Sequence, residues 1–219
     1  MNLFDILGPV MIGPSSSHTA GAARIGRVGR QLLGEPVQSA IIYLHGSFAK
    51  TYQGHGTDKA IIGGLLDMSV DDPRLRCSHD IAKQEGLQYV FQAKQIKNAH
   101  PNTVALALTG KGGAQITLQA ASVGGGNIMV QYLNGIEVGF TGECTTLVLK
   151  HMDVPGVITK STYILAKENI NIATMRVFRA NLGGEAVMVI ELDGIPSEQV
   201  LDQLRNQDKV EQVILINKL

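Results

Sequence analysis

The C-terminal third of the sequence alternates apolar, strand-like runs with helix-like segments in one fixed order. Pro155 stands at the start of one helical pattern and Ser197 precedes a second, and both residue types favour helix initiation at these positions. The predicted elements are a strand at 147–149, a helix at 155–168, strands at 170–179 and 185–192, a helix at 197–204 and a strand at 210–216. This βαββαβ order is that of one ferredoxin-like unit, which restricts this part of the chain to an α+β fold.

The preceding part of the chain predicts a mixed α/β domain. Serines 15–17 cap a helix that ends at Gly34, and an apolar strand at 39–44 carries His45 at its C-terminal end. The other predicted elements are helices at 57–66 and 78–85 and strands at 89–93, 103–109, 115–122 and 128–132. Because the connections between these strands are too short for crossover helices, we expect a mixed or largely antiparallel sheet. We place the boundary near Glu143, which gives domains 1–143 and 144–219.

Charge and hydropathy exclude several classes of function. Nineteen basic and nineteen acidic residues give the 219-residue chain a formal net charge of zero. A dedicated nucleic-acid or membrane-surface binder would carry an excess of basic residues, so we expect neither kind of partner. No apolar run reaches the ~18 residues needed to span a bilayer, and the N-terminus lacks the features of a secretion signal. We therefore expect a cytoplasmic protein that binds a small polar molecule.

Two short stretches gather hydroxyl and imidazole groups among glycines. The first is Gly13-Pro14-Ser15-Ser16-Ser17-His18-Thr19, and the second is His45-Gly46-Ser47 followed by Gly54-His55-Gly56-Thr57-Asp58. Capping the helix requires only one of the three serines. The hydroxyls and backbone N–H groups of Ser15, Ser16 and Ser17 are therefore candidates for binding a substrate carboxylate, which the positive end of the helix dipole also favours.

The candidate catalytic residues are His18, His45 and His55. His18 lies in the first turn of the helix, where the dipole discourages protonation, and this suits a neutral imidazole acting as a hydrogen-bond partner or a base. Each of the three histidines also has a plain structural interpretation. The remaining candidate substrate-binding residues are Thr19, Ser47, Gly54, Thr57 and Asp58. For Asp58, capping of the helix that follows is the favoured interpretation.

Two segments of the C-terminal domain resemble those of ACT domains. They are Asp153-Val154-Pro155-Gly156-Val157-Ile158 and Asn169-Ile170-Asn171-Ile172. The resemblance implies pairing of such domains through their sheets or helices, with amino acids bound between them, and it makes Val154, Gly156 and Asn169 candidate effector contacts. Pro-Gly at a helix start and Asn at a helix end also serve local geometry without any ligand.

The motifs of the N-terminal domain, together with Gly124-Gly125-Gly126, resemble the beta chain of bacterial iron–sulfur-dependent L-serine dehydratases. The resemblance covers nearly the full length. It implies that domain 1–143 is related to the allosteric substrate-binding domain of phosphoglycerate dehydrogenases, and that the reaction is α,β-elimination of L-serine to pyruvate and ammonia. In that family, one chain or one half of a fused chain supplies the cysteines of a [4Fe-4S] cluster. The resemblance therefore implies a separate alpha subunit as the partner of this chain.

The cysteine content agrees with such a division of labour. A [4Fe-4S] cluster requires three or four thiolates, whereas this chain has only Cys77 and Cys144, far apart in sequence. We therefore expect no metal site in this chain. Two other classes of function stay open: a stand-alone amino-acid sensor without catalysis, and a mononuclear metal enzyme that uses the three motif histidines. The second has weak support, because the histidines lack the close spacing typical of a metal motif.

Overall fold

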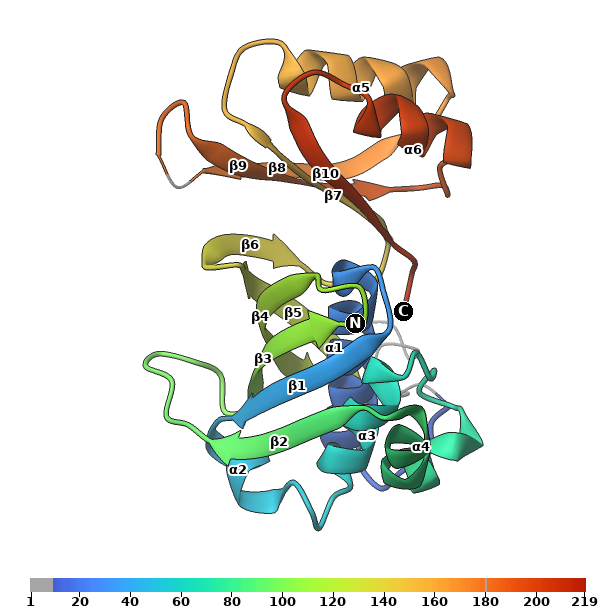
Figure 1. The fold of residues 1–219 in the computed structure, drawn as a ribbon, viewed down its shortest axis with the longest axis vertical. Helices are drawn as coiled ribbons and strands as arrows, with labels where there is room; N and C mark the ends of the chain where they lie inside the picture. Colours follow the sequence, from blue (N-terminus) through green and yellow to red (C-terminus); the bar gives the residue numbers. More distant parts are fainter. Residues whose placement is uncertain (1–9, 180) are drawn as a thin grey trace. The chain divides into compact units, whose positions relative to one another are not determined.

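The computed structural model describes residues 10–179 and 181–219, and its contacts divide the chain into two compact units, Met1–Gly135 and Ile136–Leu219. Figure 1 shows the course of both. The helices of the first unit are α1 (Gly21–Leu33), α2 (Gly46–Thr51), α3 (Thr57–Leu65) and α4 (Ser78–Glu85), with a π-helical turn at Ser16–Ala20 and a 3-10 helix at Pro73–Cys77. No helix in the described part of the chain has the length and apolar character needed to cross a bilayer.

The first sheet is mixed, as its short connections predict. Its strands are β1 (Val37–Leu44), β2 (Gln88–Ala93), β3 (Thr103–Gly110), β4 (Gln115–Gly124), β5 (Asn127–Leu133) and β6 (Ile136–Phe140), in the spatial order β2-β1-β3-β4-β5-β6. β1 pairs in parallel with β2 and antiparallel with β3, and the β3–β4 and β4–β5 pairs are antiparallel. The sequence passes from β1 to its parallel neighbour β2 through α2, α3 and α4, so the second motif follows the C-terminal end of β1, whereas the first motif precedes α1.

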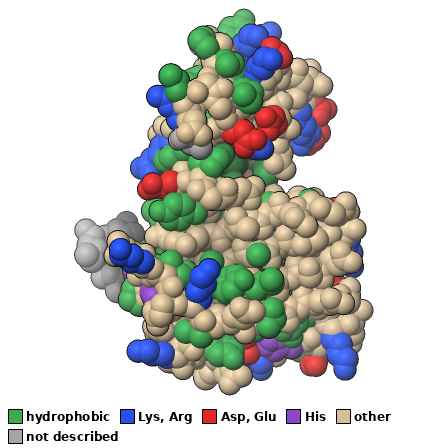
Figure 2. Space-filling model, turned by 60° about the vertical axis from the view of Figure 1, so that its left-hand side comes forward, with side chains coloured by type: hydrophobic (Ala, Val, Ile, Leu, Met, Phe, Trp, Pro, Cys, Tyr) green, Lys and Arg blue, Asp and Glu red, His purple; other side chains and the backbone are tan. Residues whose placement is uncertain are grey.

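One face of this sheet packs against helices. α1 contacts β3, β4 and β5, and its apolar residues Ile25, Val28 and Leu32 are fully buried. On the opposite face, Ile41 pairs with Val90 across the β1–β2 register, and both side chains are partly exposed. Figure 2 shows apolar side chains at the surface of the molecule. The helix-covered face is therefore the core of the first unit.

α1 and α3 approach each other closely through glycine. A Cβ atom built on Gly64 would overlap the carbonyl oxygen of Ala23, and one built on Gly26 would overlap that of Ile61. Both obstacles are backbone atoms, which cannot rotate away as a side chain can. Because Gly26 and Gly64 lack side chains, α1 and α3 can approach each other this closely.

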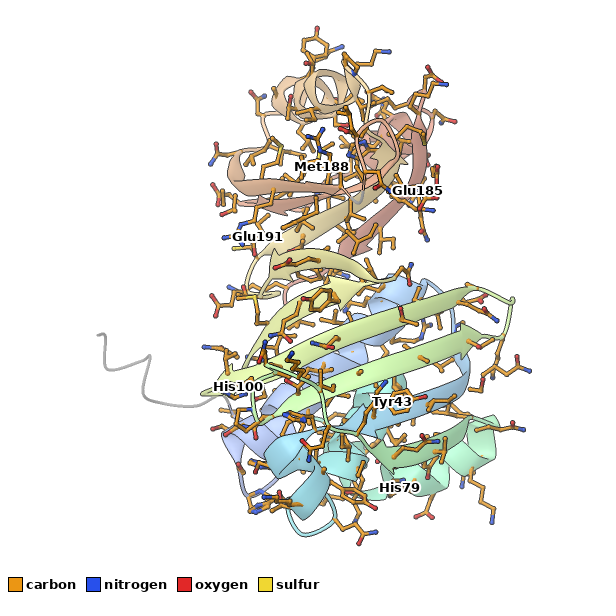
Figure 3. All side chains as sticks on the ribbon, turned by 90° about the vertical axis from the view of Figure 1, so that its left-hand side faces the viewer. Tyr43, His79, His100, Glu185, Met188 and Glu191 are labelled. Atoms are coloured by element: carbon orange, nitrogen blue, oxygen red, sulfur yellow. The ribbon has the colours of Figure 1, made fainter. Side chains whose placement is uncertain are left out.

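After β6, the second unit has the predicted βαββαβ order. Its elements are β7 (Thr145–Met152), α5 (Val157–Lys167), β8 (Ile172–Arg179), β9 (Glu185–Leu192), α6 (Glu198–Arg205) and β10 (Val210–Ile216). The sheet is antiparallel in the order β10-β7-β9-β8. Its core includes Leu149, Met188 and Leu204, and Figure 3 shows Met188 within this unit. Ser197 accepts a hydrogen bond from the Val200 backbone N–H at 3.3 Å and caps α6 as predicted.

Two short elements were absent from the sequence prediction, and one predicted cap was wrong. α2 and β6 are only six and five residues long, too short for a periodic apolar pattern to reveal them. α3 begins after Gly56, whose left-handed backbone (φ 67°) leaves neither Thr57 nor Asp58 in the capping position. The boundary near Glu143 stays a prediction, since the sheets change between β6 and β7 while the compact units divide after Gly135.

Candidate functional site

The first motif forms a tight turn that places His18 at the entrance to α1. The Ser15 hydroxyl accepts a hydrogen bond from the His18 backbone N–H at 3.3 Å, so Ser15 is the predicted cap. The chain then follows a π-helical turn, in which Ser16 and Ser17 are half-buried, before α1 starts at Gly21. Turns of this kind interrupt regular helices and are frequent at functional sites.

His18 meets the second motif through its ring. Its Nε2 atom lies 3.0 Å from the Ser47 hydroxyl, and Ser15 Oγ lies 3.5 Å from Nδ1. The buried Phe48 ring packs edge-on against the imidazole, with 5.2 Å between the ring centroids. Thr51 donates a hydrogen bond from its hydroxyl to the Ser47 carbonyl, which stabilises the short helix α2. The imidazole of His18 is thus held between two serine hydroxyls.

His55 joins the same cluster. The centroids of its ring and that of His18 are 4.9 Å apart, and the Thr19 hydroxyl donates to the His55 carbonyl oxygen at 3.2 Å. Burial lowers the pKa of His18, and the neighbouring His55 lowers it further, because both disfavour a positive charge on the ring. His18 is therefore held in the neutral form that can accept a proton.

His45 is engaged elsewhere. It precedes α2, and its Nδ1 atom accepts a hydrogen bond from the Ile96 backbone N–H at 3.1 Å. This contact ties the end of β1 to the segment that follows β2. Within the described part of the chain, the ring contacts that unite His18 with His55 do not extend to His45. Its position fits the structural interpretation better than the catalytic one.

A cavity of about 630 Å³ opens beside the cluster. The two motifs contribute Gly13, Pro14, Thr19, Gly54, His55 and Gly56 to its wall. Lys59 and Arg76 also line it, and neither forms an ion pair with another described residue. The sequence analysis missed these two cations. Lys59 lies one residue beyond the second motif, and Arg76 lies in the 3-10 helix, where no motif marks it.

Thr57 and Asp58 have other environments. The Thr57 side chain is buried, and its hydroxyl has no hydrogen-bond partner among the described residues. Asp58 Oδ2 lies 3.1 Å from His79 Nε2, so this carboxylate faces a histidine that the sequence analysis did not select. Neither residue lines the cavity.

The three candidate effector residues occupy the two loops that flank α5. Gly156 precedes the helix with a φ of +96°, and Asn169 follows it with a φ of +54°. Both are left-handed backbone conformations that favour glycine and asparagine for local geometry alone. Val154 is partly exposed. A nearby hollow lined by Thr159, Tyr163 and Asn171 includes none of the three, so effector binding there stays a prediction.

The cysteines do not form a metal site. Cys77 is exposed in the first unit and Cys144 belongs to the second. Across residues 10–179 and 181–219, no group of three or more His, Cys, Asp or Glu side chains is arranged to hold a metal ion. The residues present do not fit a [4Fe-4S] cluster, which needs at least three thiolates.

Comparisons with known proteins agree with this architecture. Residues 147–214 match the family of AHAS small subunit-like ACT domains, and residues 2–84 match the family described as serine dehydratase beta chain. A mixed-sheet domain with a histidine and serine cluster, followed by an antiparallel βαββαβ domain, defines an α+β protein of the ACT-domain class. The predicted fold class is thereby confirmed.

Full-length relatives identify the family. The chain is 43% identical over 218 residues to the probable L-serine dehydratase, beta chain, of Bacillus subtilis (strain 168), covering 100% of this chain and 97% of the relative. It is 37% identical over 191 residues to the L-serine dehydratase, beta chain, of Peptoniphilus asaccharolyticus, covering 87% and 86%. This chain belongs to the beta chains of L-serine dehydratase and is a subunit of that ammonia-lyase.

A more distant relative is a phosphoglycerate dehydrogenase, the enzyme to which the sequence analysis relates the N-terminal domain. The D-3-phosphoglycerate dehydrogenase of Bacillus subtilis (strain 168) is 28% identical over 197 residues, which covers 90% of this chain and 37% of the dehydrogenase. Part of that larger enzyme is therefore similar in sequence to most of this chain.

Proposed function

We propose that this chain binds L-serine in the cavity beside His18 and His55 and acts in its α,β-elimination to pyruvate and ammonia. The His18–Ser47 contact carries the proposal, because it places a half-buried imidazole with a lowered pKa at the meeting point of the two sequence motifs. Loss of the Cα proton and of the β-hydroxyl as water leaves an aminoacrylate, which tautomerises and hydrolyses. Since a Cα–H is a weak acid, the step requires a positioned base, and neutral His18 fits that role.

The proposal assigns the [4Fe-4S] cluster to a separate alpha subunit. Cys77 and Cys144 support this assignment, because two thiolates in different units do not make a cluster site. We also propose that the complex is cytoplasmic and that the ACT domain contributes to self-association. Thr19, Gly54 and Gly56, which line the cavity, then contact the substrate, whereas Ser15 and Ser47 do not line it and orient the His18 ring.

The test is reconstitution. We expect this chain, purified anaerobically from its native cells with the proteins that accompany it, to form pyruvate from L-serine only while a cysteine-rich partner with cluster absorbance is present. The isolated chain should be inactive. A chain that binds amino acids but forms no pyruvate, even with the candidate partner supplied, would instead favour the stand-alone sensor.

The cavity also provides two positive charges for the substrate carboxylate. We expect the double variant Lys59→Gln/Arg76→Gln to raise KM for L-serine by about 100-fold or more, because each of the two hydrogen bonds to a charged group contributes about 1.5–3 kcal/mol. If the contacts are equally strong in the ground state and the transition state, kcat stays nearly constant. Steady-state kinetics of the assembled enzyme measure both.

Arg74→Gln is the matched control for this prediction. Arg74 lies in the same 3-10 helix as Arg76, but its guanidinium pairs with Asp72 at 2.6 Å and does not line the cavity. We expect its KM to match that of the unmodified enzyme. An equal rise of KM in both variants would show a general charge effect and no carboxylate site.

A further inference from the structure

The segment 52–58, which carries His55, has two kinds of restraint. Within the segment, the Thr57 backbone N–H donates to the Tyr52 carbonyl at 2.9 Å, and Gly56 adopts a left-handed backbone. The other restraint comes from side chains outside the segment, which contact both of its ends. These side chains belong to α4 and β2 and are not explained by substrate binding.

At the C-terminal end of the segment, Asp58 is held by a relay of two polar contacts. Asp58 Oδ2 lies 3.1 Å from His79 Nε2, and His79 Nδ1 lies 2.7 Å from the Tyr89 hydroxyl. His79 belongs to α4 and Tyr89 to β2, and Figure 3 labels His79 at the α4 helix. The other carboxylate oxygen, Oδ1, is buried and has no hydrogen-bond partner among the described residues. His79 is therefore the partner that holds this carboxylate in place.

At the N-terminal end, Tyr52 is held by stacking. Its ring lies against Phe91 with 5.6 Å between centroids and an interplanar angle of 26°. Phe91 meets Tyr89 edge-on at 5.9 Å, and Tyr89 stacks on His79 at 5.6 Å. A continuous set of side-chain contacts thus connects the two ends of segment 52–58. It consists, in order, of Tyr52, Phe91, Tyr89, His79 and Asp58.

The protonation of the relay follows from its partners. Burial raises the pKa of Tyr89, and the negative charges of Asp58 and Asp80 raise it further, so its hydroxyl stays protonated. With Nε2–H of His79 donating to Asp58, Nδ1 is free to accept from the Tyr89 hydroxyl when the ring is neutral. Each group then has one defined role, which favours a single orientation of the histidine ring.

We propose that His79 and Tyr89 are positioning residues that fix segment 52–58 and thereby hold His55 against His18. The expected effect on catalysis rests on the proposed function. The expected effect on the position of His55 does not depend on it. Because this set of contacts crosses three elements, removing one polar contact should loosen the segment without exposing the core. Misplacement of a catalytic group by about 1 Å can cost as much as 100-fold in rate.

The experiment compares His79→Phe, Tyr89→Phe and His79→Gln in the assembled enzyme. His79→Phe keeps a ring that can stack on Tyr89 but loses both nitrogens, and we expect kcat to fall by about 10- to 100-fold. His79→Gln restores a side-chain amide donor and should recover most of the loss. Tyr89→Phe should give a smaller decrease, because the histidine–carboxylate contact remains. Tyr43→Phe is the matched control, since Tyr43 packs beneath Lys94 rather than against His79.

A second readout needs no activity. The imidazole NMR signals of His18 and His55 in the isolated chain, assigned with single His→Gln variants, should shift in His79→Phe and stay in place in Tyr43→Phe. Unchanged signals together with unchanged kcat would overturn the inference. If the unmodified complex forms no pyruvate, the proposed function fails, and the imidazole signals alone then decide whether His79 positions the segment. If His79→Phe does not fold, Tyr89→Phe takes its place in both arms.

Discussion

Replacing His18 by alanine is expected to lower turnover of L-serine by the assembled enzyme by about 10²- to 10⁴-fold, the range typical of a lost acid–base or electrostatic contribution. The expectation follows from the position of the ring. His18 touches Ser47 and His55, which come from the other motif, and burial and the neighbouring imidazole both lower its pKa. Single-turnover measurement of pyruvate formation would separate this chemical step from substrate binding.

His18→Gln distinguishes a proton acceptor from a hydrogen-bond partner. The amide can still contact the Ser47 hydroxyl but cannot take up a proton at neutral pH. If His18 is the base, His18→Gln should be as slow as His18→Ala. Activity within a few-fold of the unmodified enzyme, in a folded and assembled variant, would leave His18 only a binding role.

The dependence of kcat/KM on pH provides a further check on the same residue. Because the pKa of His18 is lowered, the ring stays neutral at pH values where an ordinary histidine, with a pKa near 6.5, is half protonated. The acidic decline of kcat/KM should therefore lie below pH 6.5. His55→Gln removes the imidazole that lowers the pKa of His18 and should move the decline toward higher pH, by only part of the displacement, since burial is the larger cause.

The second large effect concerns stability. Gly64→Ala is expected to lower the free energy of unfolding of the first unit by about 3 kcal/mol, the upper part of the range for overpacking a close contact. The added methyl group would overlap the Ala23 carbonyl oxygen, a backbone atom of α1 that cannot move alone. Gly26→Ala should act in the same way against the Ile61 carbonyl.

Hydrogen exchange followed by mass spectrometry would localise this effect. We expect faster exchange in α1 and α3 of the Gly64→Ala variant, with the second unit unchanged. Gly194→Ala is the control, because a Cβ there meets no atom within 4 Å and the backbone requires no positive φ. Equal protection of α1 in both variants would mean that the helices accommodate the methyl group.

The second domain could be predicted from sequence because its signals are local. Pro155 and Ser197 mark helix starts, and each apolar run has the length of one strand, so neighbouring residues suffice to define the elements. α2 carries no such signal, since it follows a histidine and spans less than two helical turns. The cap predicted at Asp58 was wrong for a related reason, because it is the left-handed Gly56 that precedes α3.

The sequence predicts which residue types form the candidate site, but it does not predict which of these residues contact one another. Residues His18 and His55 are 37 positions apart, and they meet because α1 packs on α3, a long-range contact that no local pattern encodes. His45 is separate from these two histidines and accepts a hydrogen bond from the Ile96 backbone N–H. Asp58 contacts His79 because the fold places α4 beside it. Sequence therefore indicated a polar site, whereas the tertiary contacts place its candidate residues in different environments.

The glycine contact between α1 and α3 also bears on how mutational screens of this chain should be interpreted. In a selection for growth on L-serine, inactive clones with substitutions at positions 26 and 64 would be recovered beside those at position 18, although neither glycine touches the cavity. Their common signature would be low protein abundance, since a marginally stable fold loses folded molecules before it loses chemistry. Scoring abundance with growth would separate the two glycines from the imidazole.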